Sequence, residues 1–254
     1  MNIVIITGAS SGIGQEFAKQ IDKGFSNIDE IWLMARRKER LEELAAGMNH
    51  QTRILAVDVN DEYAMDDLEQ LLYECDCRVR MLVNCAGYGI FGQVDEMEME
   101  EQLGMIQTNC EALTRLTYLC LPYMYKNSRI INLASSAAFM PQAGFAVYAA
   151  SKAYVLSFSR GLNQELRKRH IYVTAVCPGP VRTEFFDLAE RYGGTLAIKR
   201  LVMAEVENVV DLALRDSYNR KDISVYSIPI KAFMVLTKYV PHSVIMAVTR
   251  HMKG

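Results

Sequence analysis

The chain has 254 residues, half of them apolar and 23% charged, and 28 Lys and Arg against 30 Asp and Glu give a formal net charge of −2. This balance provides no basic surface for nucleic acid, and high apolar content at low net charge argues against disorder. The length suits one domain spanning residues 1–254, because no Pro-, Gly- or Ser-rich linker interrupts the pattern.

The cysteines and the apolar segments indicate the cellular compartment in which the protein is expected. Six scattered cysteines are too few for a disulfide scaffold and lack the paired spacing of a zinc site. We therefore expect reduced thiols, no bound metal and a cytoplasmic location. The apolar start of the chain has no basic segment before it and runs directly into Thr7, so it is expected to be a buried strand rather than a signal peptide. No run reaches the roughly 18 apolar residues of a membrane span.

Short apolar runs alternate with longer segments of helical periodicity. Several runs are β-branched without polar alternation, which is typical of strands buried on both faces. Strands are expected at Ile3–Thr7, Glu30–Ala35, Arg53–Val57, Arg80–Val83, Arg129–Leu133, Tyr172–Cys177 and Ile223–Tyr226. Helices are expected at Gly12–Lys23, Lys38–Gly47, Asp61–Glu74, Glu100–Tyr125, Tyr148–His170 and Glu205–Ser217. The alternation predicts a doubly wound α/β fold with about seven parallel strands and helices on both faces.

A glycine-rich turn, residues 8–14, joins the first strand to the first helix. Gly8 permits a tight turn, Gly12 permits close approach to a phosphate, and Gly14 permits close packing of helix on strand. The free N–H groups and positive dipole end of the helix suit a pyrophosphate. The spacing G-x-x-x-G-x-G differs from G-x-G-x-x-G, and such a loop can be a plain turn, but its place at the first strand–helix junction predicts a dinucleotide site.

The second strand is followed by Arg36 and Arg37. At this point an acidic residue binds the ribose 2′-hydroxyl of NAD, whereas an arginine accommodates the 2′-phosphate of NADP. Two guanidiniums and no carboxylate favour NADP(H), with NAD(H) possible. The alternative is that both arginines simply begin a solvated helix.

Candidate catalytic groups are a tyrosine, a lysine and a serine. Tyr148 and Lys152 lie one helical turn apart on one face, where an ammonium group would lower the tyrosine pKa from its usual value of about 10. Ser135 follows the strand Arg129–Leu133, at the sheet edge where ligands of open α/β sheets bind. Ser136 competes with Ser135 for this role, and the Tyr–Lys pair alone could be an ordinary surface pair.

Over roughly residues 1–225 the order and separation of these motifs resemble the short-chain dehydrogenase/reductase family. The residues that carry the resemblance are Thr7–Gly14, Asp58-Val59, Asn84-Cys85-Ala86-Gly87, Asn109, Ser135, Tyr148, Lys152, and Pro178-Gly179-Pro180-Val181 with Thr183. Cys85 departs from the family pattern, which often has a second asparagine there.

The resemblance implies roles for these residues. Tyr148 would donate a proton in reduction and accept one in oxidation, Lys152 would lower its pKa and hold the nicotinamide ribose, and Ser135 would orient the carbonyl. Asn109 would hold a water linking Lys152 to solvent, unless it only bonds to its own helix backbone, and Asp58 would contact the adenine unless it is simply a loop acid. The expected cofactor-binding residues are Gly8, Ser10, Ser11, Gly12, Ile13, Gly14, Arg36, Arg37, Asp58, Val59, Asn84, Ala86, Gly87, Tyr148, Lys152, Pro178, Gly179, Val181 and Thr183.

The resemblance also implies that residues 184–204 form a lid over the substrate. Phe185, Phe186 and Leu188 would line an apolar pocket, unless they pack in the core, and Gly193-Gly194 would act as a hinge. An apolar lid favours a hydrophobic ketone and its secondary alcohol, with a hydroxysteroid and its oxosteroid as the leading substrate pair. The alternatives are reduction of 3-oxoacyl thioesters and a non-catalytic dinucleotide-sensing protein.

The last segment, residues 228–254, combines apolar residues with lysines such as Lys231 and Lys238. Such a segment can lie in a lipid interface, cover the pocket mouth or contact another subunit. The resemblance also implies a homodimer or homotetramer built on the helices around Glu100–Tyr125 and Tyr148–His170.

Overall fold

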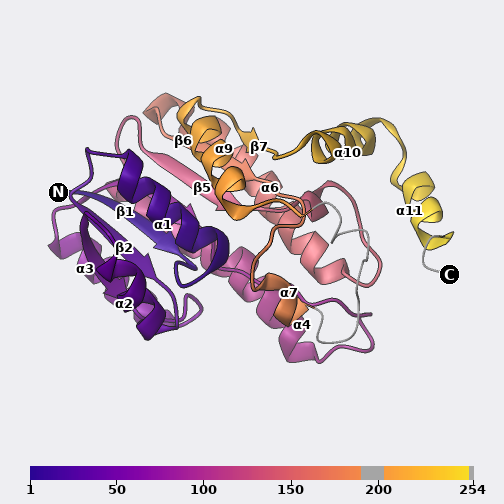
Figure 1. The fold of residues 1–254 in the computed structure, drawn as a ribbon, viewed down its shortest axis with the longest axis horizontal. Helices are drawn as coiled ribbons and strands as arrows, with labels where there is room; N and C mark the ends of the chain where they lie inside the picture. The colour runs from indigo at the N-terminus through magenta and orange to yellow at the C-terminus, as the bar shows by residue number, and fades with distance from the viewer. Residues whose placement is uncertain (190–202, 252–254) are drawn as a thin grey trace.

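The computed structural model describes residues 1–189 and 203–251, and its centre is a seven-stranded sheet (Figure 1). The strands are β1 (Asn2–Thr7), β2 (Glu30–Met34), β3 (Gln51–Leu55), β4 (Arg78–Asn84), β5 (Arg129–Leu133), β6 (Tyr172–Val176) and β7 (Ile223–Ser224). Their order is β3-β2-β1-β4-β5-β6-β7, and every neighbouring pair is parallel. The doubly wound α/β prediction is confirmed.

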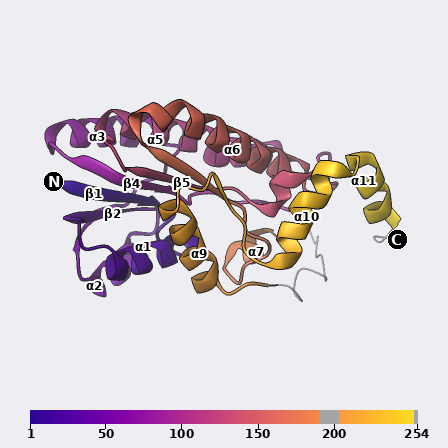
Figure 2. The same cartoon turned by 90° about the horizontal axis from the view of Figure 1, so that it is seen from above.

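Helices cover both faces of the sheet. One face carries α1 (Gly12–Gly24), α2 (Lys38–Ala46) and α9 (Val206–Tyr218), and the other carries α3 (Glu62–Glu74), α5 (Leu113–Cys120) and α6 (Ala146–Glu165), as Figure 2 shows. The strand β1 is buried on both faces of the sheet, which explains why its apolar run has no polar alternation. Val4 and Ile6 pack into the core under α1, whereas Ile3 and Ile5 pack into the core under α3 and α5, and all four are fully buried.

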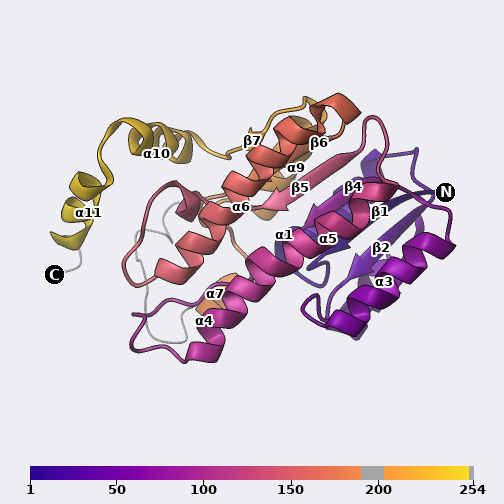
Figure 3. The same ribbon diagram turned by 180° about the vertical axis from the view of Figure 1, so that it is seen from behind.

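The helix predicted at Glu100–Tyr125 is in fact composite. It consists of α4 (Met99–Ile106), a π-helical turn η1 (Gln107–Ala112), α5, and a 3₁₀ turn η2 (Leu121–Tyr123) that contains Pro122. Figure 3 shows α4 and α5. Sequence periodicity does not distinguish a π turn from the α-helix on either side. The insertion matters because π turns occur frequently at functional sites, and this one carries Asn109.

The edge strand β3 begins and ends two residues earlier than the predicted Arg53–Val57. Val57 lies instead beyond the strand, where it lines the cleft described below. The helix α6 also differs from its predicted bounds of Tyr148–His170, because it begins at Ala146 and ends at Glu165. A 3₁₀ turn follows it, and then His170 in the left-handed conformation, with φ +55°.

The C-terminal segment forms two helices, α10 (Ile228–Tyr239) and α11 (His242–His251), which extend beyond the body of the molecule (Figures 1 and 2). The inner face of α10 packs on the short 3₁₀ turn η3 (Ser136–Phe139), where Phe233 and Phe139 have ring centroids 6.2 Å apart. The outer face exposes Ile228, Val235 and Tyr239. None of the helices in residues 1–189 and 203–251 combines the length and the apolar character needed to cross a bilayer.

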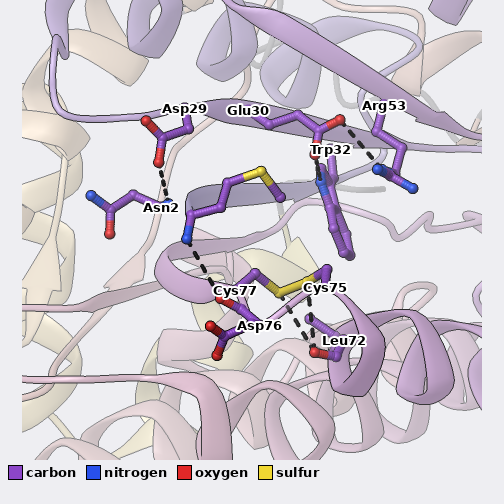
Figure 4. Close-up of a disulfide and its surroundings, with 10 residues drawn as sticks. Asn2, Asp29, Glu30, Trp32, Arg53, Leu72, Cys75, Asp76 and Cys77 are labelled. Atoms are coloured by element: carbon purple, nitrogen blue, oxygen red, sulfur yellow. Dashed lines mark hydrogen bonds and ion pairs between the residues drawn. A yellow bond between two sulfur atoms is a disulfide. The ribbon is translucent and has the colours of Figure 1, made fainter.

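The expectation that every cysteine is a reduced thiol is wrong for one pair. Cys75 and Cys77 form a disulfide in the short connection between α3 and β4 (Figure 4). Only Asp76 separates them in the sequence, and its carbonyl oxygen lies 3.5 Å from the N-terminal ammonium group of Met1. The other four cysteines, at 85, 110, 120 and 177, are buried free thiols.

A buried carboxylate ties α1 to the segment that enters β3. Asp22 accepts hydrogen bonds from the backbone N–H groups of Asn49 and His50 and from the Asn49 side-chain amide, at 2.8–3.0 Å. Burial alone would raise the Asp22 pKa, but the hydrogen bonds from His50 and Asn49 outweigh it and leave the pKa below its usual value.

We expect Asp22→Ala to lower the free energy of unfolding by about 2 kcal/mol at pH 7, because it removes hydrogen bonds to a charged acceptor and leaves buried donors unpaired. The folded-state pKa is depressed, so this contribution is present above the unfolded-state pKa of about 3.9 and is lost as the pH falls through the folded-state value. Urea denaturation at pH 7 and at pH 3.5 measures the difference. If the difference in the free energy of unfolding between wild type and variant were as large at pH 3.5 as at pH 7, the stabilisation would not come from the ionised Asp22 carboxylate.

Candidate active site

A cleft of about 450 Å³ lies at the carboxyl ends of the six strands from β1 to β6. It is lined by most of the residues singled out from the sequence: Gly8, Ser10, Ser11, Gly12, Ile13, Gly14, Arg36, Arg37, Asp58, Val59, Ala86, Gly87, Ser135, Tyr148, Lys152, Pro178, Gly179, Val181 and Thr183. Segments far apart in the chain therefore converge at one edge of the sheet, as expected for a parallel α/β fold.

Two of the predicted residues do not line the cleft. The side chain of Asn84 is buried in the sheet, where its amide donates to Asn132 at 2.9 Å and to Thr117 at 3.3 Å. The prediction that Asn84 contacts the cofactor is therefore not met by its side chain. Asn109 lies behind the cleft wall, because a Cβ on Gly87 would be 2.5 Å from the Asn109 Oδ1.

The glycine-rich turn has the geometry of a phosphate cradle. Gly8 and Gly12 have φ of +66° and +55°, which favour glycine. A Cβ on Gly8 would lie 2.9 Å from the backbone of Cys85 and Ala86, and one on Gly14 would lie 2.4 Å from the Gly8 carbonyl oxygen. The α1 N-cap residue makes no side-chain cap bond, so the N–H groups of the first turn remain for an anion. The chain thus fits a dinucleotide pyrophosphate.

Arginines gather at the end of the cleft beside this turn. Arg37 donates to the hydroxyls of Ser10, at 3.1 Å, and Ser11, at 2.7 Å. Arg36 lies further out, with an exposed side chain 3.7 Å from the Asp58 carboxylate. The sequence had assigned Asp58 to the adenine and Arg36 to a 2′-phosphate separately, and the structure places the two in contact.

The three candidate catalytic side chains come together in the wall of the cleft. Tyr148 and Lys152, on the first turns of α6, are 7% and 4% exposed. The tyrosine hydroxyl hydrogen-bonds to the Ser135 side chain at the end of β5. The Lys152 ammonium group donates to the Leu133 carbonyl at 2.8 Å and lies 5.7 Å from the centroid of the Tyr148 ring.

Burial is the largest influence on the pKa values of Tyr148 and Lys152. Desolvation raises the pKa of Tyr148 to about 12, against the lowering effect of its hydrogen bond with Ser135. Desolvation also lowers the pKa of Lys152 to about 8, against the nearby thiols of Cys85, Cys110 and Cys177. The expectation that Lys152 brings the Tyr148 pKa toward neutrality is therefore not met, and Tyr148 is in its protonated form at pH 7.

Asn109 holds the wall of the cleft in place. It is buried in the π turn, where its Oδ1 accepts from the Tyr88 N–H at 3.0 Å and its Nδ2 donates to the Tyr88 carbonyl at 2.9 Å. The same Nδ2 lies 3.0 Å from the Ser151 hydroxyl on α6. These bonds differ from the helix-interior alternative, because they join the loop after β4 to α6, beside Tyr148 and Lys152.

Aromatic rings form the side of the cleft next to Tyr148. Phe145 stacks on the tyrosine ring, with centroids 4.2 Å apart, and Phe91 stacks on Phe145 at 4.0 Å. On the other side Phe185 lies 5.6 Å from Tyr148 and contacts Phe186 edge-on. Both phenylalanines predicted in the lid, which belong to the short helix α7 (Phe185–Ala189), line the cleft, whereas the predicted hinge Gly193-Gly194 lies outside the described residues.

Sequence reasoning missed four contributors to this site. Phe91 and Phe145 give no local signal, because isolated apolar residues occur throughout the core. Gly89 was also missed, although a Cβ there would lie 2.4 Å from the Tyr148 ring. Glu184, expected only as the start of the lid, pairs with Arg37 and Arg40 across more than 140 residues of sequence.

Residues 2–191 match the family model for short chain dehydrogenases. Sulfoacetaldehyde reductase 2 from Chromohalobacter salexigens is 38% identical over 191 residues, which cover 72% of this chain and 74% of that protein. Serine 3-dehydrogenase from Agrobacterium fabrum is 34% identical over 187 residues, covering 72% and 73%.

Among solved structures, a short-chain dehydrogenase from Sphingobium yanoikuyae in complex with NADPH superposes with a TM-score of 0.80 at 30% identity, covering 100% of this chain and 96% of that one. The family match spans most of the chain, the relatives exceed 30% identity over more than two thirds of it, and the motifs lie around one cleft. The chain therefore belongs to the short-chain dehydrogenase/reductase family and is an NAD(P)-dependent oxidoreductase acting on CH–OH groups.

Proposed function

We propose that this protein interconverts a hydrophobic ketone and its secondary alcohol with NADP(H), with an oxosteroid and its hydroxysteroid as the leading substrate pair. The observation that carries the proposal is the Tyr148 hydroxyl, hydrogen-bonded to Ser135 and enclosed by phenylalanine rings at the cleft wall. A flat apolar substrate can lie along these rings with its carbonyl oxygen at the tyrosine and serine hydroxyls.

Three residues of the chain have separate roles in this reaction. When bound, the dinucleotide supplies or accepts the hydride. Tyr148 donates the proton to the carbonyl oxygen in reduction, and its pKa of about 12 means that it carries this proton at pH 7. Ser135 donates a hydrogen bond to the same oxygen as negative charge develops there. Lys152, with a pKa of about 8, is mostly charged at pH 7 and adds a positive charge 5.7 Å from the centroid of the Tyr148 ring.

The preference for NADP(H) is supported by the arginines after β2 and by the absence of a carboxylate in the residues 34–37 that end this strand. The Sphingobium yanoikuyae relative was solved with NADPH. We place the adenosine ribose beside Arg37 and Ser11, the pyrophosphate on the turn from Gly8 to Gly14, and the nicotinamide against Gly179.

The experiment that tests the proposal is oxidation of NADPH and of NADH, side by side, with oxosteroids, aromatic ketones, a 3-oxoacyl thioester and sulfoacetaldehyde. Turnover of an oxosteroid or an aromatic ketone with NADPH supports it. Turnover of the thioester alone would favour the alternative substrate class. Turnover confined to the small anionic aldehyde, or a preference for NADH, would contradict the proposed substrate or cofactor.

We also propose that the enzyme is a homo-oligomer that uses the outer face of α4, α5 and α6. Its four buried free thiols support a cytoplasmic location, against which the single Cys75–Cys77 disulfide stands. The outer face of α4, α5 and α6 exposes apolar side chains that a subunit contact would cover, namely Leu103, Ile106, Tyr118 and Tyr154. Tyr118→Glu should therefore lower the molar mass measured by light scattering after gel filtration. An unchanged mass, or a wild type that runs as a monomer, would contradict this interface.

The tail is proposed to close one end of the cleft. Ile230 at the start of α10 lies against Gly179, where a Cβ would be 2.8 Å from its Cδ1 atom. Deletion of residues 231–254 should raise KM for a ketone, because it removes the packing that holds Ile230 in place. If KM is unchanged and the deletion abolishes lipid binding, the tail contacts a lipid surface. If KM is unchanged and the deletion abolishes assembly, the tail contacts another subunit.

A further inference from the structure

Glu184 occupies the arginine cluster at the adenosine end of the cleft. One carboxylate oxygen accepts a hydrogen bond from Arg37 at 3.0 Å, and the other pairs with Arg40. Hydrogen bonds from Arg40 and then Arg37 hold the pKa of this carboxyl below its usual value, so it is ionised at neutral pH. Its side chain is about half exposed, at 47%, so an incoming ligand can reach it from solvent.

The same arginine also contacts the glycine-rich turn. Arg37 donates to the hydroxyls of Ser10 and Ser11 while it holds Glu184. Two guanidiniums hold the Glu184 carboxylate, and one of them also holds two hydroxyls. Guanidinium and hydroxyl groups are the partners that a phosphate monoester takes in proteins. Glu184 lies between two hollows: the main cleft, which Arg37 lines, and a second hollow, which Arg40 lines together with the carboxylates of Glu16, Glu43 and Glu207. There is therefore space beside the Glu184 carboxylate on the side of each arginine.

Arg36, which directly precedes Arg37 in the sequence, has different surroundings. Arg36 faces outward, with a side chain 78% exposed and an ion pair of 3.7 Å to Asp58. Arg37 and Arg40, by contrast, converge on one carboxylate. The position best arranged to bind a doubly charged group is therefore the one that Glu184 already fills.

We infer that Glu184 competes with the 2′-phosphate of NADP(H) for Arg37 and Arg40, and thereby sets how strongly the enzyme prefers NADP(H) to NAD(H). The inference rests on the proposed function, because it assumes that the adenosine ribose lies beside Arg37. A ligand without the 2′-phosphate leaves the carboxylate in place, whereas the phosphate must displace or repel it. Exposed ion pairs are individually weak, so a doubly charged phosphate can displace them.

The test measures binding at the adenosine end alone. Adenosine 2′,5′-bisphosphate and AMP differ by the 2′-phosphate and carry no nicotinamide, so calorimetric titration of each reports this subsite without turnover. We expect Glu184→Gln to tighten bisphosphate binding by about three- to tenfold, the range expected from losing two exposed ion pairs. AMP binding should change less than twofold. The gain should shrink in high salt, which screens charges at the surface.

Two further variants serve as controls. Glu205→Gln removes a nearby carboxylate that pairs with Arg182 at 3.3 Å, leaves Arg37 and Arg40 untouched, and should not alter the ratio of the two affinities. Arg40→Met, measured alone and combined with Glu184→Gln, completes a double-mutant cycle. Because the competition requires Arg40, the gain from Glu184→Gln should fall in the Arg40→Met background.

The possible outcomes separate this inference from the proposed function. Wild type that binds bisphosphate no better than AMP would overturn the NADP(H) preference itself, whatever the variants do. Wild type that prefers bisphosphate, with Glu184→Gln unchanged or weaker, would overturn only the competition, since it would show that Glu184 is neutral or positions the arginines for the phosphate. A tighter variant with Glu205→Gln unchanged establishes the competition.

Discussion

Replacing Tyr148 by Phe is expected to lower kcat for carbonyl reduction by about 10²- to 10⁴-fold, the usual contribution of a positioned general acid. The substitution is well matched, because the ring that stacks on Phe145 and lies against Phe185 is kept and only the hydroxyl is lost. NADPH binding should therefore change little. Initial rates of NADPH oxidation give kcat, and fluorescence titration gives the dissociation constant.

Tyr154→Phe is the control for this variant. Tyr154 lies on the same helix, α6, but is partly exposed outside the cleft, where its hydroxyl lies 2.9 Å from that of Thr114. Its kcat should stay within about twofold of wild type, since no proton transfer depends on it. If Tyr148→Phe retained a comparable kcat, Tyr148 would not be the proton donor.

The strands and their parallel pairing could be predicted because each strand is a local apolar run and because parallel pairing follows from the strand–helix alternation, whereas the order of the strands in the sheet was not predicted. β1 is the clearest case, with side chains buried on both faces of the sheet. Prediction was poorer at β3, an edge strand whose residues are mostly half-buried and whose ends are not marked by hydrophobicity. The π turn at Asn109 gave no signal, because one extra residue in a turn leaves the apolar pattern on both sides intact.

The site was predictable where its residues carry a positional motif, as Gly8, Gly14, Tyr148 and Lys152 do. It was not predictable where long-range geometry decides. Asn84 belongs to a motif, yet its amide is bonded to Asn132 inside the sheet. The protonation of Tyr148 was misjudged for a related reason: the lysine spacing is visible in the sequence, whereas the burial that raises the pKa is a property of the folded chain.

Gly89 is a glycine required by the site rather than by the backbone. Its φ lies outside the left-handed region, so alanine is conformationally permitted there, but a Cβ would be 2.4 Å from Cδ2 of the Tyr148 ring. The ring is held by Phe145 on one face and cannot move without breaking that stack. We expect Gly89→Ala to reduce kcat by about 10²-fold, because displacing a catalytic group by about 1 Å has a cost of that order.

Gly161→Ala provides the matched control, because its Cβ would meet nothing within 4 Å and it lies on the same helix as Tyr148. That variant should keep wild-type kcat and raise the free energy of unfolding by about 0.5–1 kcal/mol, the usual gain of alanine over glycine inside a helix. Measuring kcat and urea denaturation for both variants separates displacement of Tyr148 from a general effect on folding. A folded Gly89→Ala enzyme with wild-type kcat would show that the tyrosine ring can shift without loss of proton transfer, and that the wall around it does not fix its position.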